Sequence, residues 1–356
     1  MERKIRSILL KFGLGMLLLL FMAWGGLRLF FHFNEIPIYD ARLIYNFIFH
    51  SDRPLKQYEN LAQKLGYTSS DKLLIIHADD LGLARSVNKA SFEALSKGFV
   101  SSASVMMPSP FAEEVAAYYL ENPHIDLGLH LTFTAEWVGY KWTGVASADE
   151  IETLLDEEGF LHQNKVTVIK EGSNSQIKIE LQAQIDYARA LGIAPTHMDC
   201  HEGTLFFDPE FLRTYIEVGH QNQIPVFVPN LLAPHFDEQF PLPSQVVLVD
   251  QMFMALKGTE LNAMEEYYQD VLSSIKPGLN QLLIHLAFDD EEMNAITKDR
   301  EAYGAKWRAQ DYQIVSSRKF QDLLKQNNIK LIQWRDIQAV LYPDENTVYQ
   351  PQKSLR

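Results

Sequence analysis

Apolar residues in this chain gather into short runs that alternate with longer amphipathic stretches. The run Lys72–Ile76 is too short for a helix and is bounded by polar residues, which is typical of a strand covered on both faces of a parallel sheet. Further strand-like runs follow at Ala103–Met107, Ile125–Phe133, Thr196–Cys200, Val226–Val228, Gln281–Phe288 and Lys330–Trp334. Helix-like stretches lie between them at Ser86–Lys97, Phe111–Leu120, Ile177–Leu191, Pro209–His220, Ala263–Ile275 and Ser317–Asn327. About seven such repeats predict an α/β fold whose parallel sheet forms a closed or nearly closed barrel, with an open doubly wound sheet as the alternative.

The length of the chain allows one large α/β domain with appendages. Its 356 residues are divided by the pattern into a lead-in segment at 34–70, a barrel domain at 71–342 and a polar tail at 343–356. The formal net charge of -14 argues against a nucleic-acid partner. Cys200 is the single cysteine, so neither an intrachain disulfide nor a multi-cysteine metal site is possible. The sequence leaves the oligomeric state open.

The first 33 residues have the composition of a membrane-targeting segment. Four basic residues precede the apolar run Phe12–Leu27. This run is somewhat shorter than the roughly 20 residues that span a bilayer, but Lys11 and Arg28 can extend it by snorkelling. We expect a signal anchor or, because small residues flank Trp24, a cleaved signal peptide; a buried core helix is the third reading. The first two place the catalytic domain outside the cytoplasm, either anchored to the membrane or exported.

Acidic and histidine residues follow two of the predicted strands. Asp79 and Asp80 come directly after the first strand, in the motif H-A-D-D-L-G that begins at His77, and we expect them on a loop. His130 lies in G-L-H-L-T, at the end of a second strand-like run. Because the carboxyl ends of parallel strands meet at one edge of the sheet, these side chains are expected close together. An isolated Asp pair would more often cap a helix or form a turn, but the other motifs favour a site.

A third motif, T-H-M-D-C-H-E-G-T at Thr196–Thr204, adds three titratable groups. His197, Asp199 and His201 are spaced by two, so all three face the same side of an extended segment. Such groups are costly to bury unless they share a partner. A metal bound by His201, with Asp199 or His197 orienting that ring, is the interpretation we favour over a solvated edge strand.

A fourth histidine, His285, ends the apolar run that begins at Gln281. Its place at a strand end makes it a candidate proton donor to a leaving group, although a structural role is equally compatible. Arg308 and Asp311, in the later stretch W-R-A-Q-D, are candidates to hold His285 or to line the cleft.

In these motifs the chain resembles the YdjC-like family of carbohydrate deacetylases, which includes chitooligosaccharide deacetylases and hopanoid-associated relatives. The resemblance covers about residues 61–337 and also rests on I-H-L at Ile284–Leu286 and on I-K-L-I-Q-W-R-D-I at Ile329–Ile337. It implies a distorted (β/α) TIM-like barrel, one divalent metal ion, magnesium or zinc, bound by Asp80, His130 and His201, and Asp79 as the general base. His77, His197, Asp199, Arg308 and Asp311 would then surround these groups.

The implied reaction is hydrolysis of an N-acetyl amide on a carbohydrate or glycolipid, with Asp79 removing a proton from water and His285 assisting the departing amine. After His201 this sequence continues Glu-Gly-Thr-Leu-Phe-Phe rather than with the further histidines of several chitooligosaccharide-type relatives, which leaves the sugar undefined. A metal-dependent phosphoesterase is a second reading, lowered because the three ligand motifs contain no Lys or Arg. A non-catalytic envelope glycan-binding protein is the third.

Overall fold

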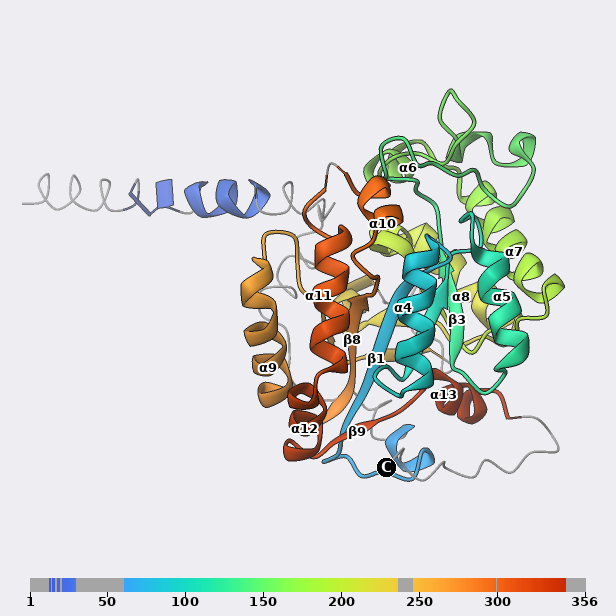
Figure 1. Ribbon diagram of the computed structural model, residues 1–356. Coiled ribbons are helices and arrows are strands. Elements are labelled where there is room, and N and C mark those ends of the chain that lie inside the picture. Colours follow the sequence, from blue (N-terminus) through green and yellow to red (C-terminus); the bar gives the residue numbers. More distant parts are fainter. Residues whose placement is uncertain are drawn as a thin grey trace, which may run out of the picture.

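A curled parallel β-sheet lies at the centre of the molecule, with helices around it (Figure 1). The computed structural model describes residues 13, 15–16, 18–19, 21–29, 61–235, 246–298 and 300–343. The strands are β1 (Lys72–Leu81), β2 (Ser102–Val105), β3 (Leu127–Leu131), β4 (Met198–Cys200), β5 (Phe227–Pro229), β6 (Val247–Val249), β7 (Gln251–Phe253), β8 (Gly278–His285) and β9 (Ile329–Leu331).

The strand β1 pairs with three other strands of the sheet, β2, β8 and β9. The strand order is β4-β3-β2-β1-β8-β7, and β9 pairs with the first three residues of β1. All ladders between these strands are parallel. Consequently the carboxyl ends of β1, β2, β3, β4 and β8 face the same edge of the sheet, which is where active sites form in parallel α/β folds.

The pairing continues beyond β4, but irregularly. β5 and β6 form a two-stranded sheet, and a single bridge between Met198 and Val226 connects it to β4. At the other side the chain passes from β6 through Asp250 into β7, whose partner is β8. The Asp250 carboxylate accepts a hydrogen bond from the Leu279 amide at this break, at 2.9 Å. The result is a curled parallel sheet consistent with a distorted TIM-like barrel.

The helices α4 to α13 surround this sheet or cover its ends. They are α4 (Arg85–Ser96), α5 (Ala112–Glu121), α6 (Lys165–Glu171), α7 (Asn174–Ala190), α8 (Pro209–Gln221), α9 (Met264–Ser274), α10 (Glu291–Ile296), α11 (Ala305–Ser316), α12 (Arg318–Gln326) and α13 (Trp334–Leu341) among the described residues. In Figure 1, α6 and α10 lie at the top of the view, and α12, α13 and β9 lie at the bottom. Short 3₁₀ turns fill the connections at Ala148–Glu150, Glu152–Leu154, His201–Phe206, Asn230–His235 and Leu261–Ala263.

Local signals account for the helices that the sequence predicted well. α8 begins with Pro209 at its first turn, and the Asp208 carboxylate accepts hydrogen bonds from the amides of Glu210 and Phe211, as is usual for an N-cap followed by proline. Ser317 caps α12 in the same way through the Phe320 amide.

Two sequence expectations about elements were wrong. The predicted strand Lys330–Trp334 ends at Leu331, and Trp334 instead begins α13, which the side chains of Gln333 and Asp336 cap reciprocally. The Asp pair lies within β1 rather than on a loop after it. The helices α6, α10, α11 and α13 and the strands β6 and β7 were not predicted, because most of them are too short to show a period.

The described residues leave out three parts of the chain: much of the predicted segment at 1–33, positions 34–60 of the lead-in, and the tail from 344. Residues 21–29 are helical, with Phe21 75% and Trp24 46% exposed. Among the residues described, no helix is both long and apolar enough to cross a membrane. The domain boundaries stay a prediction.

Candidate metal centre

An irregularity in β1 turns two adjacent carboxylates toward the same cluster of side chains. The pairing of β1 with β2 shifts register between Ala78 and Leu81, and Asp80 there has a φ of 67°, which is uncommon for a residue with a Cβ atom. Neighbouring strand residues normally face opposite sides. At this bulge, Asp79 Oδ1 lies 3.2 Å from His77 Nε2 and Asp80 Oδ1 lies 3.2 Å from His130 Nε2. The strain thus occurs where both acids enter one site.

Three of the predicted residues converge on one point. Asp80 Oδ1 lies 3.2 Å from His130 Nε2 and 3.2 Å from His201 Nδ1. The two ring nitrogens lie 3.2 Å from each other. The three donor atoms, which come from β1, β3 and the residue directly after β4, therefore form a nearly equilateral triangle. All three side chains are buried.

This triangle fits a divalent cation. Metal to oxygen or nitrogen bonds of about 2.1 Å place neighbouring ligand atoms about 3.0 Å apart in octahedral geometry and about 3.4 Å apart in tetrahedral geometry. The observed 3.2 Å separations fall between these values. In addition, Asp80 Oδ1 is buried without a hydrogen-bond partner, which is unusual for a carboxylate oxygen. A mixed oxygen and nitrogen donor set does not select between magnesium and zinc.

Two other sets of possible metal ligands share Asp199 and fit a cation less well. They are His77, His197 and Asp199, and Asp79, His130 and Asp199. The two carboxylate oxygens of Asp199 lie 2.7 Å from His77 Nε2 and 2.7 Å from His130 Nδ1. Ser104 donates a third hydrogen bond to Asp199 at 2.9 Å. The two shorter distances are those of direct hydrogen bonds between charged or polar partners rather than of atoms separated by a metal ion. Asp199 therefore belongs to the hydrogen-bonded surroundings of the triangle.

Each imidazole of the triangle has a carboxylate on its other nitrogen. Asp199 contacts His130 Nδ1 at 2.7 Å, and Glu136 Oε2 contacts His201 Nε2 at 3.0 Å. Such contacts orient ring donors toward a metal and strengthen them. The predicted orientation of His201 by Asp199 or His197 is wrong, because Glu136 contacts that ring and Asp199 contacts His77 and His130.

Glu136 was missed entirely. It lies six residues beyond His130 in the long segment after β3, where no strand period exists to place it. A glutamate between the apolar neighbours Ala135 and Trp137 was the one available signal.

His197 lies apart from the triangle. Its ring stacks on Trp334 with centroids 5.2 Å apart, and Nδ1 lies 3.0 Å from Thr196 Oγ1. Gly128 leaves room for the ring, because a Cβ atom there would lie 2.4 Å from it. His197 touches the cluster through the edge of His77, at 4.9 Å between centroids. It therefore packs beneath the site. Cys200 is a free buried thiol.

Arg308 pairs with Asp80 rather than with His285. Its Nη2 atom donates to Asp80 Oδ2 at 2.7 Å, and its Nε atom donates to the Tyr303 carbonyl at 2.6 Å. The second oxygen of Asp80 is thus held by a buried cation while the first faces the two histidines. Of the two roles that the sequence left open for Arg308, a contact with His285 is therefore wrong, and a place beside the site stays.

His285 joins the site at a greater distance. It is the strand partner of Asp79 in the β1–β8 ladder, and its Nε2 atom lies 4.0 Å from Asp80 Oδ2. Asp311 holds the backbone rather than the ring of His285, since its Oδ2 atom accepts from the His285 amide at 3.1 Å. Its other oxygen accepts from Tyr268 at 2.6 Å.

The two adjacent acids have opposite pKa shifts. Burial raises the pKa of Asp79 to about 7, a rise that the nearby imidazoles of His130 and His77 only partly oppose. Burial also acts on Asp80, but Arg308 and the histidines outweigh it and hold the pKa well below its usual range. At neutral pH, Asp80 is therefore a permanent anion, whereas Asp79 can gain and lose a proton.

The histidines also differ from one another. Burial lowers the pKa of His201, but Glu136 and Asp80 outweigh it and raise the pKa to about 10. Burial also lowers the pKa of His130, but Asp199 and Asp79 outweigh it and hold the pKa well above its usual value. Burial lowers the pKa of His285 to about 3, so this ring is neutral at pH 7. A cation that enters the triangle must displace the ring protons of His130 and His201.

Comparison with known proteins assigns the family. The YdjC-like protein family matches residues 73–326, which contain all the side chains of the cluster. This chain belongs to the YdjC-like family.

Its relatives include a protein named carbohydrate deacetylase from Thermoanaerobacter pseudethanolicus, 27% identical over 73% of this chain and 97% of the relative. A protein of the same name from Thermus thermophilus is 28% identical over 67% of this chain and 85% of its own length. A solved structure from Enterococcus faecalis, described as a putative cellobiose-phosphate cleavage protein, superposes with a TM-score of 0.62 at 21% identity. It covers 75% of this chain and 99% of its own, and at this identity it supports the fold alone.

The contact between Glu136 and His201 generates a prediction about metal affinity. Glu136→Gln keeps the size of the side chain but removes the charge that orients and polarises His201, so the affinity for Zn²⁺ or Mg²⁺ should fall about 10- to 100-fold. Isothermal titration calorimetry on the metal-stripped protein measures this. His201→Ala, which removes a ligand, gives the lowest metal affinity expected. The matched control is Glu157→Gln, because Glu157 is an exposed glutamate. Equal affinities for Glu136→Gln and the control would contradict the assigned orientation.

Proposed function

We propose that this protein is a metal-dependent hydrolase that removes N-acetyl groups from an amino-sugar-containing carbohydrate or glycolipid. The observation that carries the proposal is the triangle of Asp80, His130 and His201 donors with the titratable carboxyl of Asp79 beside it. Relatives named carbohydrate deacetylase support the choice of an acetylated sugar as substrate. In a site of this kind a divalent cation polarises the acetyl carbonyl and makes water more acidic.

The residues then have separate tasks. Asp80, His130 and His201 hold the cation, and Arg308 fixes the orientation of Asp80. Asp79 takes a proton from the attacking water, for which a pKa of about 7 is suited. The water oxygen bonds to the acetyl carbon as the carbon to nitrogen bond breaks, giving acetate and a free amine.

The charge state of His285 limits the role that it can have in the reaction. A ring with a pKa of about 3 enters the reaction neutral, so it offers an N–H hydrogen bond rather than a ready proton. Asp79 can return to the departing amine the proton that it removed from water, since its pKa suits both directions. We therefore assign His285 to orientation of the leaving nitrogen and Asp79 to proton transfer.

A phosphoesterase is the second candidate. The three ligand motifs contain no Lys or Arg, but the fold brings Arg308 to within 2.7 Å of Asp80, and a buried cation at a metal site suits phosphate. Because Asp80 already engages this guanidinium, we retain the deacetylase as the leading proposal. Assay of phosphomonoesters beside acetylated sugars separates the two.

We infer that residues 1–33 attach the protein to the membrane, with the catalytic domain outside the cytoplasm. The support is the basic start followed by an apolar run, together with the exposed apolar side chains Phe21, Trp24 and Leu29 among the described residues.

The catalytic proposal predicts acetate release that depends on Asp79. Purified, metal-loaded protein should release acetate from a panel of N-acetylglucosamine oligomers, peptidoglycan fragments and glycolipids, measured by mass spectrometry. Asp79→Asn should lower kcat about 10²- to 10⁴-fold with metal content unchanged, whereas Asp149→Asn, on the surface, should match the wild type. A folded, metal-loaded protein that released acetate from none of these sugars would refute the deacetylase, and a glycan-binding protein would be indifferent to Asp79→Asn.

The pKa of Asp79 predicts the acid limb of the pH profile. The base must be ionised, and its pKa of about 7 means that it is protonated and inactive in acid. A bound cation stabilises the carboxylate, so log kcat/KM should rise with pH to a midpoint at or below about 7. Initial rates at constant ionic strength measure this. A rate that does not change between about pH 4 and pH 8 would contradict the assignment.

The location of the chain is tested by fractionation. The full chain should stay with membranes after alkaline carbonate extraction and be digested by protease added outside the cytoplasmic membrane. A variant that lacks residues 1–33 should remain in the cytoplasm. Recovery of the full-length chain in the soluble cytoplasmic fraction would contradict the inference.

A further inference from the structure

The segment that follows β3 carries Glu136 and is held at both of its ends by helix α7. This segment runs from 132 to 146, and Glu136 within it contacts His201 Nε2 at 3.0 Å. Two fully buried side chains of α7, Glu180 and Gln184, form hydrogen bonds to its first and last residues. They are four residues apart in the helix, so they lie on the same face and act on the segment together.

The Gln184 side chain takes the place of a neighbouring strand where the chain leaves the sheet. β3 ends at Leu131. The amide of the next residue, Thr132, donates to Gln184 Oε1 at 3.0 Å, and Gln184 Nε2 donates to the Thr132 carbonyl at 2.8 Å. A primary amide offers the same donor and acceptor as a peptide group, so it satisfies both buried backbone groups. Because the Thr132 hydroxyl donates to the His130 carbonyl at 2.6 Å, Gln184 fixes the chain between a ligand of the triangle and Glu136.

Glu180 determines which way the Gln184 amide faces. Its Oε1 atom accepts a hydrogen bond from Gln184 Nε2 at 2.9 Å, and a carboxylate oxygen at this place is compatible only with the nitrogen end of the amide. The same carboxylate accepts from the backbone amides of Val145 and Ala146, each at 2.9 Å. A Cβ atom on Gly144 would lie 2.8 Å from Glu180 Oε2, so only a glycine there lets the carboxylate approach this closely.

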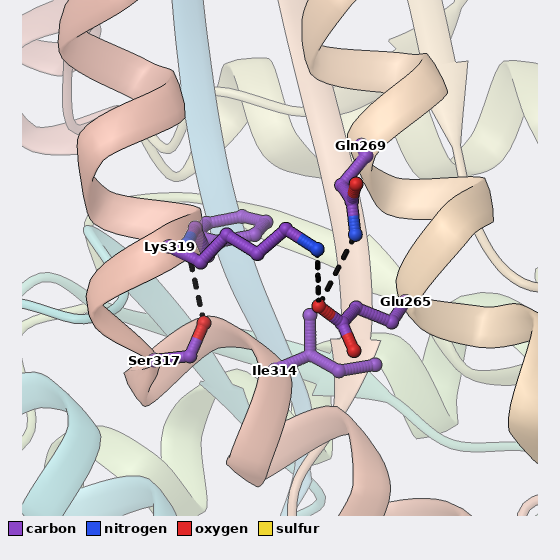
Figure 2. Close-up of a pocket in the computed structure, with 6 residues that line it drawn as sticks. Glu265, Gln269, Ile314, Ser317 and Lys319 are labelled. Atoms are coloured by element: carbon purple, nitrogen blue, oxygen red, sulfur yellow. Dashed lines mark hydrogen bonds and ion pairs between the residues drawn. The ribbon is translucent and has the colours of Figure 1, made fainter.

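A second pair of the same residue types lies at the surface, on α9. Gln269 Nε2 donates to Glu265 Oε1 at 3.2 Å across one turn of that helix (Figure 2). Glu265 is exposed, and the same oxygen also contacts the Lys319 ammonium of α12 at 2.8 Å. Exposed pairs of this spacing stabilise a helix only slightly. The pair of Glu180 and Gln184 differs in its burial and in its backbone partners, so its effect extends to the segment that carries Glu136.

We propose that Glu180 and Gln184 are positioning residues for the metal centre and that they act through Glu136. Glu180 fixes the amide of Gln184, and this amide fixes the backbone at Thr132. The backbone then presents the Glu136 carboxylate to His201, which is thereby oriented toward the cation. This inference rests on the metal site of the proposed function and does not depend on which sugar is cleaved.

The first test measures metal affinity. Gln184→Met keeps the length of the side chain but removes the amide, and it should weaken the binding of Zn²⁺ or Mg²⁺ to the metal-stripped, full-length protein about 3- to 30-fold, by isothermal titration calorimetry. The loss should stay below that of Glu136→Gln, because Arg300 still holds the Glu136 carbonyl at 2.8 Å. Glu180→Gln should act in the same direction and more weakly. Gln269→Met, the same change in the surface pair of α9 (Figure 2), is the matched control and should bind metal as the wild type does.

A double-mutant cycle separates positioning from a general loss of stability. If Gln184 acts through Glu136, adding Gln184→Met to Glu136→Gln should weaken metal binding by less than about twofold more. A further loss as large as that in the wild-type background, or wild-type affinity in Gln184→Met alone, overturns the inference while the deacetylase function stands. If Gln184→Met does not fold, Glu180→Gln completes the same cycle with the same two outcomes.

Failure of the proposed function has a different signature. If metal binds but no sugar releases acetate, the deacetylase proposal fails, and the cycle in metal affinity still decides the role of the pair. If the wild type binds neither cation, the metal site fails, and the cycle is measured by urea unfolding of the metal-free protein. The destabilisation by Gln184→Met and Glu136→Gln together should then be smaller than the sum of the two single effects, and additive effects overturn the inference.

Discussion

The buried carboxylate of Asp80 is the group around which the site is assembled. It is 2% exposed, and leaving such a charge without a partner costs about 3 to 5 kcal/mol. Arg308 neutralises one of its oxygens at 2.7 Å, so the protein can bury the acid without a metal. The other oxygen has no hydrogen-bond partner and faces two imidazoles. One half of the carboxylate thus serves the stability of the fold, and the other half is left available for a ligand.

The same constraint explains the surrounding polar shell. Two imidazoles that converge on one oxygen repel each other when both carry protons on the facing nitrogens. Asp199 and Glu136, one behind each ring, hold the rings in place and stabilise their positive charge. The charges of these side chains balance one another in a low-dielectric interior. Removal of any one of them therefore leaves the charge of its partner without a counter-charge. A divalent cation in the triangle would provide the positive charge that the ring protons supply otherwise.

The bulge in β1 decides which side chains reach the site. A regular strand would direct Asp79 and Asp80 to opposite faces, and only one of them could join the cluster. The register shift and the left-handed conformation of Asp80 bring both to it, at a cost of order 1 to 3 kcal/mol for such a residue. The two acids then acquire opposite pKa shifts, because Arg308 lies against Asp80 and not against Asp79. Adjacent positions in the sequence thereby become a fixed anion and a titratable carboxyl group.

The sequence alone determined the alternation of strands and helices, the strand ends that carry Asp80, His130 and His201, and the family. These features depend on local periodicity and on residues next to each other in the chain. The order of strands, the bulge, the pairing of Arg308 with Asp80 and the contact of Glu136 with His201 were decided by tertiary structure. Glu136 and Arg308 lie on a long connection and on α11, 65 and 228 residues from their partners, and a periodic pattern carries no information about contacts at such separations. Only burial, which forces each charge to find a partner, selects them.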